Sequence, residues 1–319
     1  MKILICGATG FMGRNLFEYF SKDPNNQVYG TSFSKEKYHE NIYKVNLKNE
    51  GEVNVLFNMI HPDVVIQAAA ITTGVKDEKE RPYIHVTDNV IINSLVLREA
   101  FLSKVKHFLF LSCGVMYPPS EIPLKESDWK ETDKIADVYF GGAWMKIYTE
   151  KACEFYSMHG MKCTAIRHSN TYGPYDKNDP DRSHVLAGTV RKVMHANDTV
   201  SIWGSGKEGR DFVYVTDVIN AVQLLINKQV QPFELVNVSA GYALTINELV
   251  DKVIQYSGKK LSITHDTSKP TVPITLCFDH SYIENKYGWT PLVNIDAGLK
   301  MTLEWYKKHY MEENNEFKK

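Results

Sequence analysis

A closely spaced group of glycines near the amino terminus is suited to binding a phosphate anion. Residues 7–13 read Gly-Ala-Thr-Gly-Phe-Met-Gly, follow an apolar run and open a segment with helical periodicity. Glycines permit a tight turn and let backbone N–H groups approach a pyrophosphate at a helix amino terminus, where the helix dipole favours anions. Because the motif lies between a first strand and a first helix, it predicts a dinucleotide site rather than a plain turn. The residues expected to contact the dinucleotide here are Gly7, Thr9, Gly10, Phe11, Met12 and Gly13.

The end of the expected second strand bears on which dinucleotide binds. An NAD-selective site usually has an acidic residue there for the ribose diol. Residues 30–35 read Gly-Thr-Ser-Phe-Ser-Lys and contain no carboxylate. Ser32, Ser34 and Lys35, with help from Arg14, could instead accept a 2′-phosphate. The sequence therefore favours NADP over NAD, with ordinary turn residues as the alternative.

Strand-like and helix-like segments alternate through the first half of the chain. The expected strands are Ile3–Cys6, Gln27–Thr31, Val64–Ala68, His107–Ser112 and Cys163–Arg167. The expected helices are Phe11–Phe20, Val53–Met59, Asn89–Leu102 and Met145–Met158. Such alternation calls for a parallel sheet covered by helices on both faces. We therefore predict an α/β fold with a Rossmann-type, doubly wound parallel sheet.

The pattern loosens after residue 173. Further helices are expected at His184–His195 and Thr245–Gly258, among short strands. This half predicts a smaller C-terminal α+β domain that covers the substrate. The expected division is residues 1–173 for the cofactor, with some later segments returning to that domain, and residues 174–319 mainly for the substrate.

Composition and charge exclude several classes of function. The chain has 319 residues, 43% of them apolar and 24% charged, which is ordinary for a globular protein. A net charge of −1 gives no electrostatic footprint for nucleic acid or an anionic membrane. There is neither a signal-peptide pattern nor an apolar run of about 18 residues, so we expect a cytoplasmic protein. The five cysteines are scattered without metal-ligand spacing, so we expect reduced thiols and no metal.

The most specific stretches of the sequence lie between residues 172 and 217. Residues 172–176 read Tyr-Gly-Pro-Tyr-Asp, 183–185 Ser-His-Val, 203–206 Trp-Gly-Ser-Gly and 210–217 Arg-Asp-Phe-Val-Tyr-Val-Thr-Asp. On these residues the chain resembles, over nearly its whole length, the extended short-chain dehydrogenase/reductases (the NAD-dependent epimerase/dehydratase family). Within them it is similar to the GDP-L-fucose synthase group. The resemblance implies a nucleotide-linked sugar as substrate and NADP or NAD as cofactor, and we expect a homodimer or higher homo-oligomer.

The resemblance also implies positions around the two ligands. Beside the cofactor it places Ala68, Ala69, Ala70, Ser169, Asn170 and Thr171. Around the substrate it places Asn170, His184, Val185, Lys192, Trp203 and Arg210. Arginine offers a fork of donors suited to phosphate, and tryptophan offers a face for a base or sugar. The alternatives are a surface ion pair between Arg210 and Asp211 and a buried core position for Trp203.

The catalytic positions depart from the family's pattern. The family uses a tyrosine whose pKa is lowered by a lysine four residues later, with a serine at the end of a central strand. Lys146 matches the lysine, which also contacts the cofactor ribose, but Gly142 stands at the tyrosine position. Cys113 stands at the serine position, and Ser112 should point to the other side of the strand.

Tyr139 and His184 are the candidates for the missing acid/base. Tyr139 lies seven residues before Lys146, about 10 Å along an unbroken helix rather than the usual 6 Å or so. A break at Gly141 and Gly142 could bring Tyr139 closer. His184 matches a histidine that in fucose synthases works with a cysteine in epimerisation, but Val115 stands at that cysteine's position. Cys113 could carry a proton only if it were ionised.

One segment near the carboxyl terminus also departs from the family. The family has basic residues a few positions after a Ser-Lys-Pro turn, where they hold the diphosphate. Here Ser268-Lys269-Pro270 is followed by residues 271–276, which are wholly uncharged. We therefore expect substrate binding to differ in detail.

Three functions remain open at this point. The first is an oxidoreductase at C4 of a GDP-linked sugar that oxidises a hydroxyl or reduces a keto group with modified acid/base chemistry. The second is a bifunctional epimerase and reductase of the fucose-synthase kind, carried by Cys113 and His184. The third is a pseudoenzyme that binds the cofactor without turnover: the missing tyrosine and serine favour it, whereas the retained Lys146, His184 and Arg210 oppose it.

Overall fold

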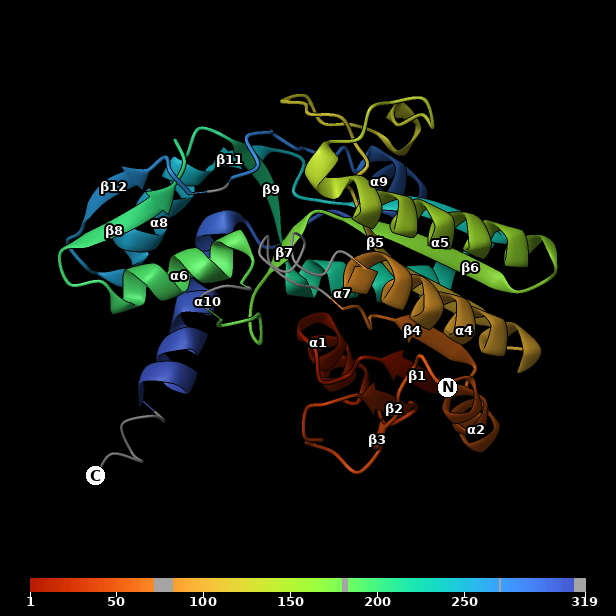
Figure 1. The fold of residues 1–319 in the computed structure, drawn as a ribbon. Helices are drawn as coiled ribbons and strands as arrows, with labels where there is room; N and C mark the ends of the chain where they lie inside the picture. Colours follow the sequence, from red (N-terminus) through yellow and green to blue (C-terminus); the bar gives the residue numbers. More distant parts are fainter. Residues whose placement is uncertain (72–82, 180–182, 270, 313–319) are drawn as a thin grey trace.

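Seven parallel strands form the central sheet of the computed structural model, which describes residues 1–71, 83–179, 183–269 and 271–312. Their order is β3–β2–β1–β4–β5–β6–β10 (Figure 1). The strands are β1 (Lys2–Cys6), β2 (Gln27–Ser32), β3 (Ile42–Lys44), β4 (Val64–Gln67), β5 (His107–Cys113), β6 (Lys162–His168) and β10 (Phe233–Val238). The middle strands are buried along most of their length on both faces, as in a sheet covered on both sides. All seven carboxyl ends therefore meet at one edge.

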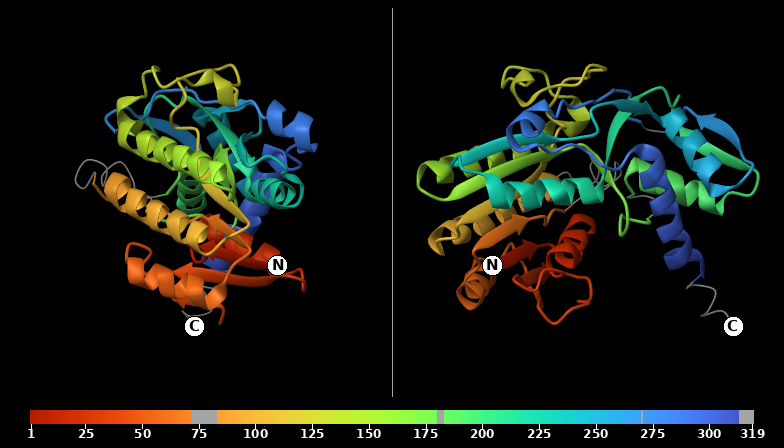
Figure 2. Two further views of the ribbon diagram at one scale, coloured as in Figure 1. Left: turned by 90° about the vertical axis from the view of Figure 1, so that its right-hand side faces the viewer. Right: turned by 180° about the vertical axis from the view of Figure 1, so that it is seen from behind.

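Helices cover both faces of this sheet (Figures 1 and 2). One face packs on α2 (Glu50–Ile60), α4 (Asn89–Leu102) and α5 (Phe140–Met158). The other packs on α1 (Phe11–Phe20), α7 (Val215–Lys228) and α9 (Ser281–Tyr287). A π-helical segment, Ile84–Asp88, leads into α4. Among the described residues, no helix has both the length and the apolar character needed to cross a bilayer.

A smaller group of elements extends beyond the large sheet, on the left in Figure 1. Its strands are β7 (Asn170–Tyr172), β9 (Gly209–Tyr214) and β11 (Ala243–Thr245), which form one sheet, and β8 (Thr199–Trp203) and β12 (Ser262–Asp266), which form another. Its helices are α6 (Val185–His195), α8 (Ile246–Ser257) and α10 (Ile295–Tyr306). Short turns of helix lie at Glu126–Asp128, Asp137–Tyr139 and Lys307–Glu312. Most of this group follows residue 173, whereas α7, β10 and α9 return to the large sheet.

The predicted Rossmann-type sheet is confirmed, with differences at helix starts. Helix α5 begins at Phe140 rather than Met145, and α2 begins at Glu50 rather than Val53. These first turns are polar or glycine-rich, so hydrophobic periodicity marks their starts too late. For α2 the start is fixed by Asn49, whose side chain accepts a hydrogen bond from the amide of Glu52.

Candidate functional site

The loop between β1 and α1 forms an open backbone cradle. Gly7 has a φ of +78°, and a β-carbon on it would lie 2.8 Å from Cα of Ala69. A β-carbon on Gly13 would lie 2.1 Å from the carbonyl oxygen of Gly7, so the first turn of α1 sits directly on the loop. Gly10 is the N-cap of α1 and supplies no side-chain cap, which leaves the first-turn amides without intrahelical partners. This arrangement fits the pyrophosphate of a dinucleotide.

Some side chains at the end of β2 form hydrogen bonds within the turn that follows. Ser32 is buried, its hydroxyl donates to the carbonyl oxygen of Lys35 at 2.5 Å, and the Thr9 hydroxyl donates to Ser32 at 3.2 Å. Nζ of Lys35 donates to the carbonyl oxygen of Thr9 at 3.2 Å, so this ammonium group lies beside the glycine loop. Ser34 is exposed. Lys35 and Ser34 could therefore contact a 2′-phosphate, whereas the Ser32 hydroxyl stabilises the turn.

Arg14, expected to assist there, is held by other groups. Its guanidinium carbon lies 4.5 Å from the ring centroid of Tyr38 and 3.9 Å from that of Tyr175. Its Nε is 3.0 Å from a carboxylate oxygen of Glu18. Arg14 would have to exchange these contacts for a phosphate.

The loop after β4 is tied to α4 and α5. Nε2 of Gln67 donates to the carbonyl oxygen of Ala69 at 3.3 Å and to Oδ1 of Asn93 at 2.8 Å. Nδ2 of Asn93 donates in turn to the Thr149 hydroxyl at 3.2 Å. Residues 68 and 69 are half-buried and residue 70 is exposed. The alanine loop is therefore held in a fixed position against the glycine loop, and a cofactor could lie along the two loops.

Lys146 reaches from α5 to the carboxyl end of β5. Its Nζ donates to the carbonyl oxygen of Leu111 at 2.8 Å and lies 4.7 Å from the ring centroid of Phe110. Burial lowers the pKa of Lys146. One turn earlier on the helix, the position of a β-carbon on Gly142 has no atom of the described residues within 4 Å, apart from its chain neighbours and the backbone of its own helix. The lysine of the expected pair is thus in place, and open space stands where the tyrosine would project.

Tyr139 lies just outside the amino end of α5. It ends a 3-10 turn over Asp137–Tyr139, and α5 begins at the next residue. The expected helix break at Gly141 and Gly142 does not occur, because both glycines lie inside α5. Tyr139 is half-buried against an apolar cluster that includes Met116. Its direction is therefore set by the 3-10 turn and this packing rather than by the glycines.

The end of β5 separates Ser112 from Cys113, as strand alternation predicts. Ser112 is buried and its hydroxyl donates to Glu150 at 2.5 Å. Glu150 forms a buried ion pair with Arg167 at 2.7 Å. Cys113 is a half-buried free thiol on the other side. Ser112 therefore belongs to a buried polar network, and Cys113 is the last residue of the strand.

The end of β6 carries a histidine that the sequence analysis did not single out. His168 is in register with Cys113 on the neighbouring strand. Its Nδ1 lies 3.0 Å from the carbonyl oxygen of Ser169 and 2.9 Å from the hydroxyl of Thr171. Asn170 is half-buried and donates to a backbone carbonyl of β9 at 3.1 Å. The signal that could have found His168 is its place directly before the expected cofactor contacts 169–171.

His184 is paired with a carboxylate that the sequence analysis also missed. Its Nδ1 lies 3.0 Å from Oδ1 of Asp176. Burial acts to lower the pKa of His184, but the hydrogen bond and charge of Asp176 outweigh it and raise the pKa. The His184 side chain is 53% exposed, so the pair can exchange a proton with a ligand. Asp176 closes the Tyr-Gly-Pro-Tyr-Asp motif, which was its only sequence signal.

Trp203 offers an exposed platform at the end of β8. It is 40% exposed, so the core alternative is wrong. Nζ of Lys192 lies 4.9 Å from the centroid of its ring and donates to the carbonyl oxygen of Ser201 at 3.0 Å. Val185, the first residue of α6, is also exposed. An indole with an ammonium group on its face can hold a planar base beside an anionic group.

The side chain of Arg210 binds backbone carbonyl groups and so acts as a clamp on another segment of the chain. Its guanidinium donates to the carbonyl oxygen of Val272 at 2.8 Å and to that of Ile274. The expected ion-pair alternative with Asp211 is wrong, because that carboxylate is buried and accepts from the amides of residues 240 and 241 at 2.8 and 3.0 Å. Arg210 thus holds the uncharged segment 271–276; Pro270, of the turn before it, lies outside the described residues.

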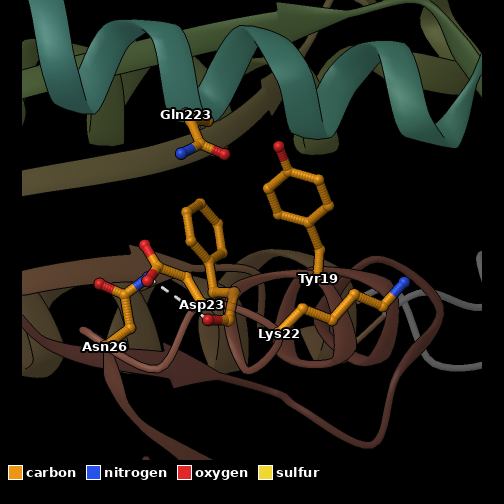
Figure 3. Close-up of a pocket in the computed structure, with 6 residues that line it drawn as sticks. Tyr19, Lys22, Asp23, Asn26 and Gln223 are labelled. Atoms are coloured by element: carbon orange, nitrogen blue, oxygen red, sulfur yellow. Dashed lines mark hydrogen bonds between the residues drawn. The ribbon is translucent and has the colours of Figure 1, made fainter.

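A surface hollow of about 290 Å³ lies elsewhere, between α1 and α7 (Figure 3). Its lining residues are Tyr19, Phe20, Lys22, Asp23, Asn26 and Gln223. In Figure 3, Gln223 extends from α7 toward the side chains at the end of α1. Because α1 begins at the carboxyl edge of the sheet, its end lies toward the opposite edge. The hollow is therefore separate from the candidate site.

Comparisons with known proteins agree with this geometry. The sequence model of the NAD dependent epimerase/dehydratase family matches residues 3–239. GDP-L-fucose synthase 1 of Arabidopsis thaliana is 30% identical over 274 residues, covering 83% of this chain and 83% of its own. GDP-L-colitose synthase of Yersinia pseudotuberculosis is 27% identical over 324 residues, covering 99% of this chain and 100% of its own. The crystal structure of UDP-glucose 4-epimerase from Thermotoga maritima superposes with a TM-score of 0.85 at 25% identity, covering 97% and 99% of the two chains. With the glycine cradle and Lys146 at one sheet edge, the match shows that this chain belongs to the NAD-dependent epimerase/dehydratase family.

Proposed function

We propose that this protein is an NAD(P)-dependent oxidoreductase acting at C4 of a GDP-linked sugar, as a dehydrogenase or a 4-keto reductase. The names of the two curated relatives support a GDP-sugar. The name of the epimerase with the similar structure supports C4. The observation that carries the proposal is Lys146, half-buried and held at the carboxyl edge of β5, on the same sheet edge as a backbone cradle fit for a dinucleotide.

The cofactor would be held by groups already in place. The amides of the glycine loop and of the first turn of α1 bind the pyrophosphate, and Lys146 binds the nicotinamide ribose. A bound nicotinamide cofactor supplies hydride acceptance or donation at the sugar carbon. Lys35 and Ser34 favour NADP, because both can reach a 2′-phosphate and no carboxylate stands there. We expect NADP(H) to bind more tightly than NAD(H) in a direct titration, and equal or reversed affinities would contradict this preference.

The substrate would lie between the two groups of elements. Trp203 and Lys192 provide a stacking face and a cation for the nucleotide, and Val185 borders them from α6. Arg210 can contact the diphosphate only by giving up bonds to segment 271–276. This division corresponds to residues 1–173 for the cofactor, with later segments returning, and residues 174–319 mainly for the nucleotide sugar.

The proton on the sugar oxygen needs a group from outside position 142. The sequence offers Tyr139, His184 and Cys113 for this role. His184 is hydrogen-bonded to Asp176, a carboxylate that can share its proton. Tyr139 adds a phenol held near the start of α5.

Two other functions have specific support. The half-buried thiol of Cys113 with His184 would suit a bifunctional epimerase and reductase of the fucose-synthase kind. The empty position at Gly142 would suit a cofactor-binding pseudoenzyme. A screen of GDP-hexoses and GDP-heptoses, as alcohols and 4-ketones, with absorbance at the reduced-nicotinamide band, separates these functions. We expect cofactor turnover with at least one GDP-sugar, and none with any of them would favour the pseudoenzyme.

We further propose a homodimer or higher homo-oligomer in the cytoplasm. Ile91 on α4 and Tyr148 and Phe155 on α5 are large and exposed. The Tyr148 hydroxyl lies 3.1 Å from that of Ser94, which joins the two helices into one outer face that a second copy could cover. All five cysteines are free thiols, which supports a reducing compartment. Light scattering during size-exclusion chromatography tests the assembly.

A further inference from the structure

We propose that His168 is the acid/base residue that takes the proton from the sugar hydroxyl, in place of the side chain missing at Gly142. This inference rests on the proposed oxidoreductase function and names a residue within it. No sequence motif pointed to His168. Its support is its place in the sheet, the orientation of its ring and the groups around it.

The open space at Gly142 leaves the strand ends to supply the proton acceptor. Among the described residues, and apart from its chain neighbours and the backbone of its own helix, no atom lies within 4 Å of the β-carbon position at Gly142, one turn before Lys146. Beside Lys146, β5 ends in Cys113 and β6 ends in His168, which are in register on adjacent parallel strands. Adjacent strands lie about 4.8 Å apart, so the imidazole and the thiol share the sheet edge where ligands of such folds bind. Of the two, a neutral imidazole is the better proton acceptor at neutral pH.

Hydrogen bonds fix which nitrogen of His168 can accept that proton. Nδ1 lies 3.0 Å from the carbonyl oxygen of Ser169, and a carbonyl only accepts, so Nδ1 carries the hydrogen. The Thr171 hydroxyl donates to the same carbonyl at 3.2 Å and lies 2.9 Å from Nδ1, where it can accept from it. The lone pair of the neutral ring is therefore on Nε2. Among the described residues Nε2 has no hydrogen-bond partner, and the ring is only half-buried.

The surroundings of His168 keep the ring neutral. Lys146 approaches from α5, Cys113 from β5 and His184 from the start of α6, while the β10 neighbour is the apolar Val238. Burial, and the charges of Lys146 and His184, lower the pKa of His168 to about 4, against the opposing effect of its bond to the Ser169 carbonyl. Asp176 raises the pKa of His184. The pKa of His168 is lowered and that of His184 is raised. Such a pair is typical of a site in which one group, here His168, is neutral and acts as the base, while the other group keeps its proton.

The proton and the hydride can be transferred in either direction. In oxidation, the O–H bond of the sugar carbinol breaks and its proton goes to Nε2 of His168. The electron pair of the C–H bond leaves as hydride to an oxidised nicotinamide, and the carbinol becomes a ketone. The imidazolium then releases its proton to solvent. Reduction of a 4-keto sugar reverses each of these transfers.

The kinetic test compares His168→Gln with His195→Gln, a histidine that bonds Tyr306 in the other group of elements. Single-turnover hydride transfer should fall about 10²- to 10⁴-fold in His168→Gln, with cofactor affinity unchanged, and stay at the wild-type rate in His195→Gln. Adding Gly142→Tyr to His168→Gln should restore part of the rate, since the space for a phenol is open. The wild-type oxidation rate should fall only below about pH 5. A wild-type rate in His168→Gln, or a fall that begins at a clearly higher pH, as protonation of His184 with its raised pKa would give, overturns the proposal.

A second measurement does not depend on turnover. In protein labelled with ¹⁵N-histidine, the ring of His168, assigned by its loss in His168→Gln, should be neutral at pH 6 with its hydrogen on Nδ1. Its Nε2 resonance should shift when oxidised cofactor and GDP-mannose are added together. An unchanged Nε2 resonance would show that His168 does not face the ligands and would overturn the inference. Absence of turnover with a shifted Nε2 would instead count against the proposed function alone.

Discussion

Gly13 and Gly142 lie near the same edge of the sheet, but glycine is required at one of these positions and not at the other. In the first turn of α1 a β-carbon on Gly13 would lie 2.1 Å from a backbone oxygen of the β1–α1 loop, so the backbone itself demands glycine. In α5 a β-carbon on Gly142 would meet no atom of the described residues within 4 Å outside its own helix, so the space there does not require glycine. The first glycine builds the cofactor cradle, and the second marks a functional group that is missing. Residue identity alone does not separate the two cases, but the space around each β-carbon does.

The largest effect should come from filling the cradle while leaving the fold intact. A β-carbon on Gly10 would lie 3.3 Å from its nearest neighbour, a carbonyl oxygen, so Gly10→Val requires little movement of the protein. Its branched side chain should cover the amides that bind pyrophosphate. We expect cofactor affinity to fall by about 3 kcal/mol or more, because hydrogen bonds to charged groups are worth about 1.5–3 kcal/mol each. Calorimetry checks this, and unchanged affinity in a folded variant would contradict the cradle.

Gly13→Ala should destabilise the protein even without cofactor. Its β-carbon would press on the backbone of Gly7, which cannot rotate away as a side chain could. Overpacking of this kind costs about 1–3 kcal/mol. Urea unfolding of the free protein measures the loss, and an unfolding midpoint equal to that of the wild type would show that the loop adapts.

Gly142→Ala should have the smallest effect, and with the opposite sign. Alanine is favoured over glycine inside a helix by about 0.5–1 kcal/mol, and nothing opposes the added methyl group. Gly141→Ala is the matched control, since its β-carbon would lie 2.7 Å from Cγ2 of Val86. Urea unfolding should place Gly142→Ala above the wild type and Gly141→Ala below Gly142→Ala. The reverse order would mean that the open space is filled in solution.

The sequence predicted the parts of the site that are local in the chain. The glycine loop needs only the strand before it and the helix after it, so residues 7–13 could be placed without the rest of the fold. His168 and Asp176 escaped prediction because their roles come from strand register and from a partner eight residues away. The clamp of Arg210 on Val272 and Ile274 joins segments about sixty residues apart. No periodicity or motif in one sequence encodes such a contact.

The most direct test of the proposed function follows the hydrogen on C4. A GDP-hexose carrying deuterium at C4 is incubated with the protein and oxidised NADP, and the cofactor and sugar are analysed by mass spectrometry. The account predicts that deuterium appears in the reduced cofactor, with no exchange of C3 or C5 hydrogens into solvent when the reaction is run in D₂O on unlabelled sugar. Exchange at C3 or C5 would show an epimerase. Cofactor that stays free of deuterium with every GDP-hexose and GDP-heptose alcohol, together with no reduction of the corresponding 4-ketones, would contradict C4 hydride transfer.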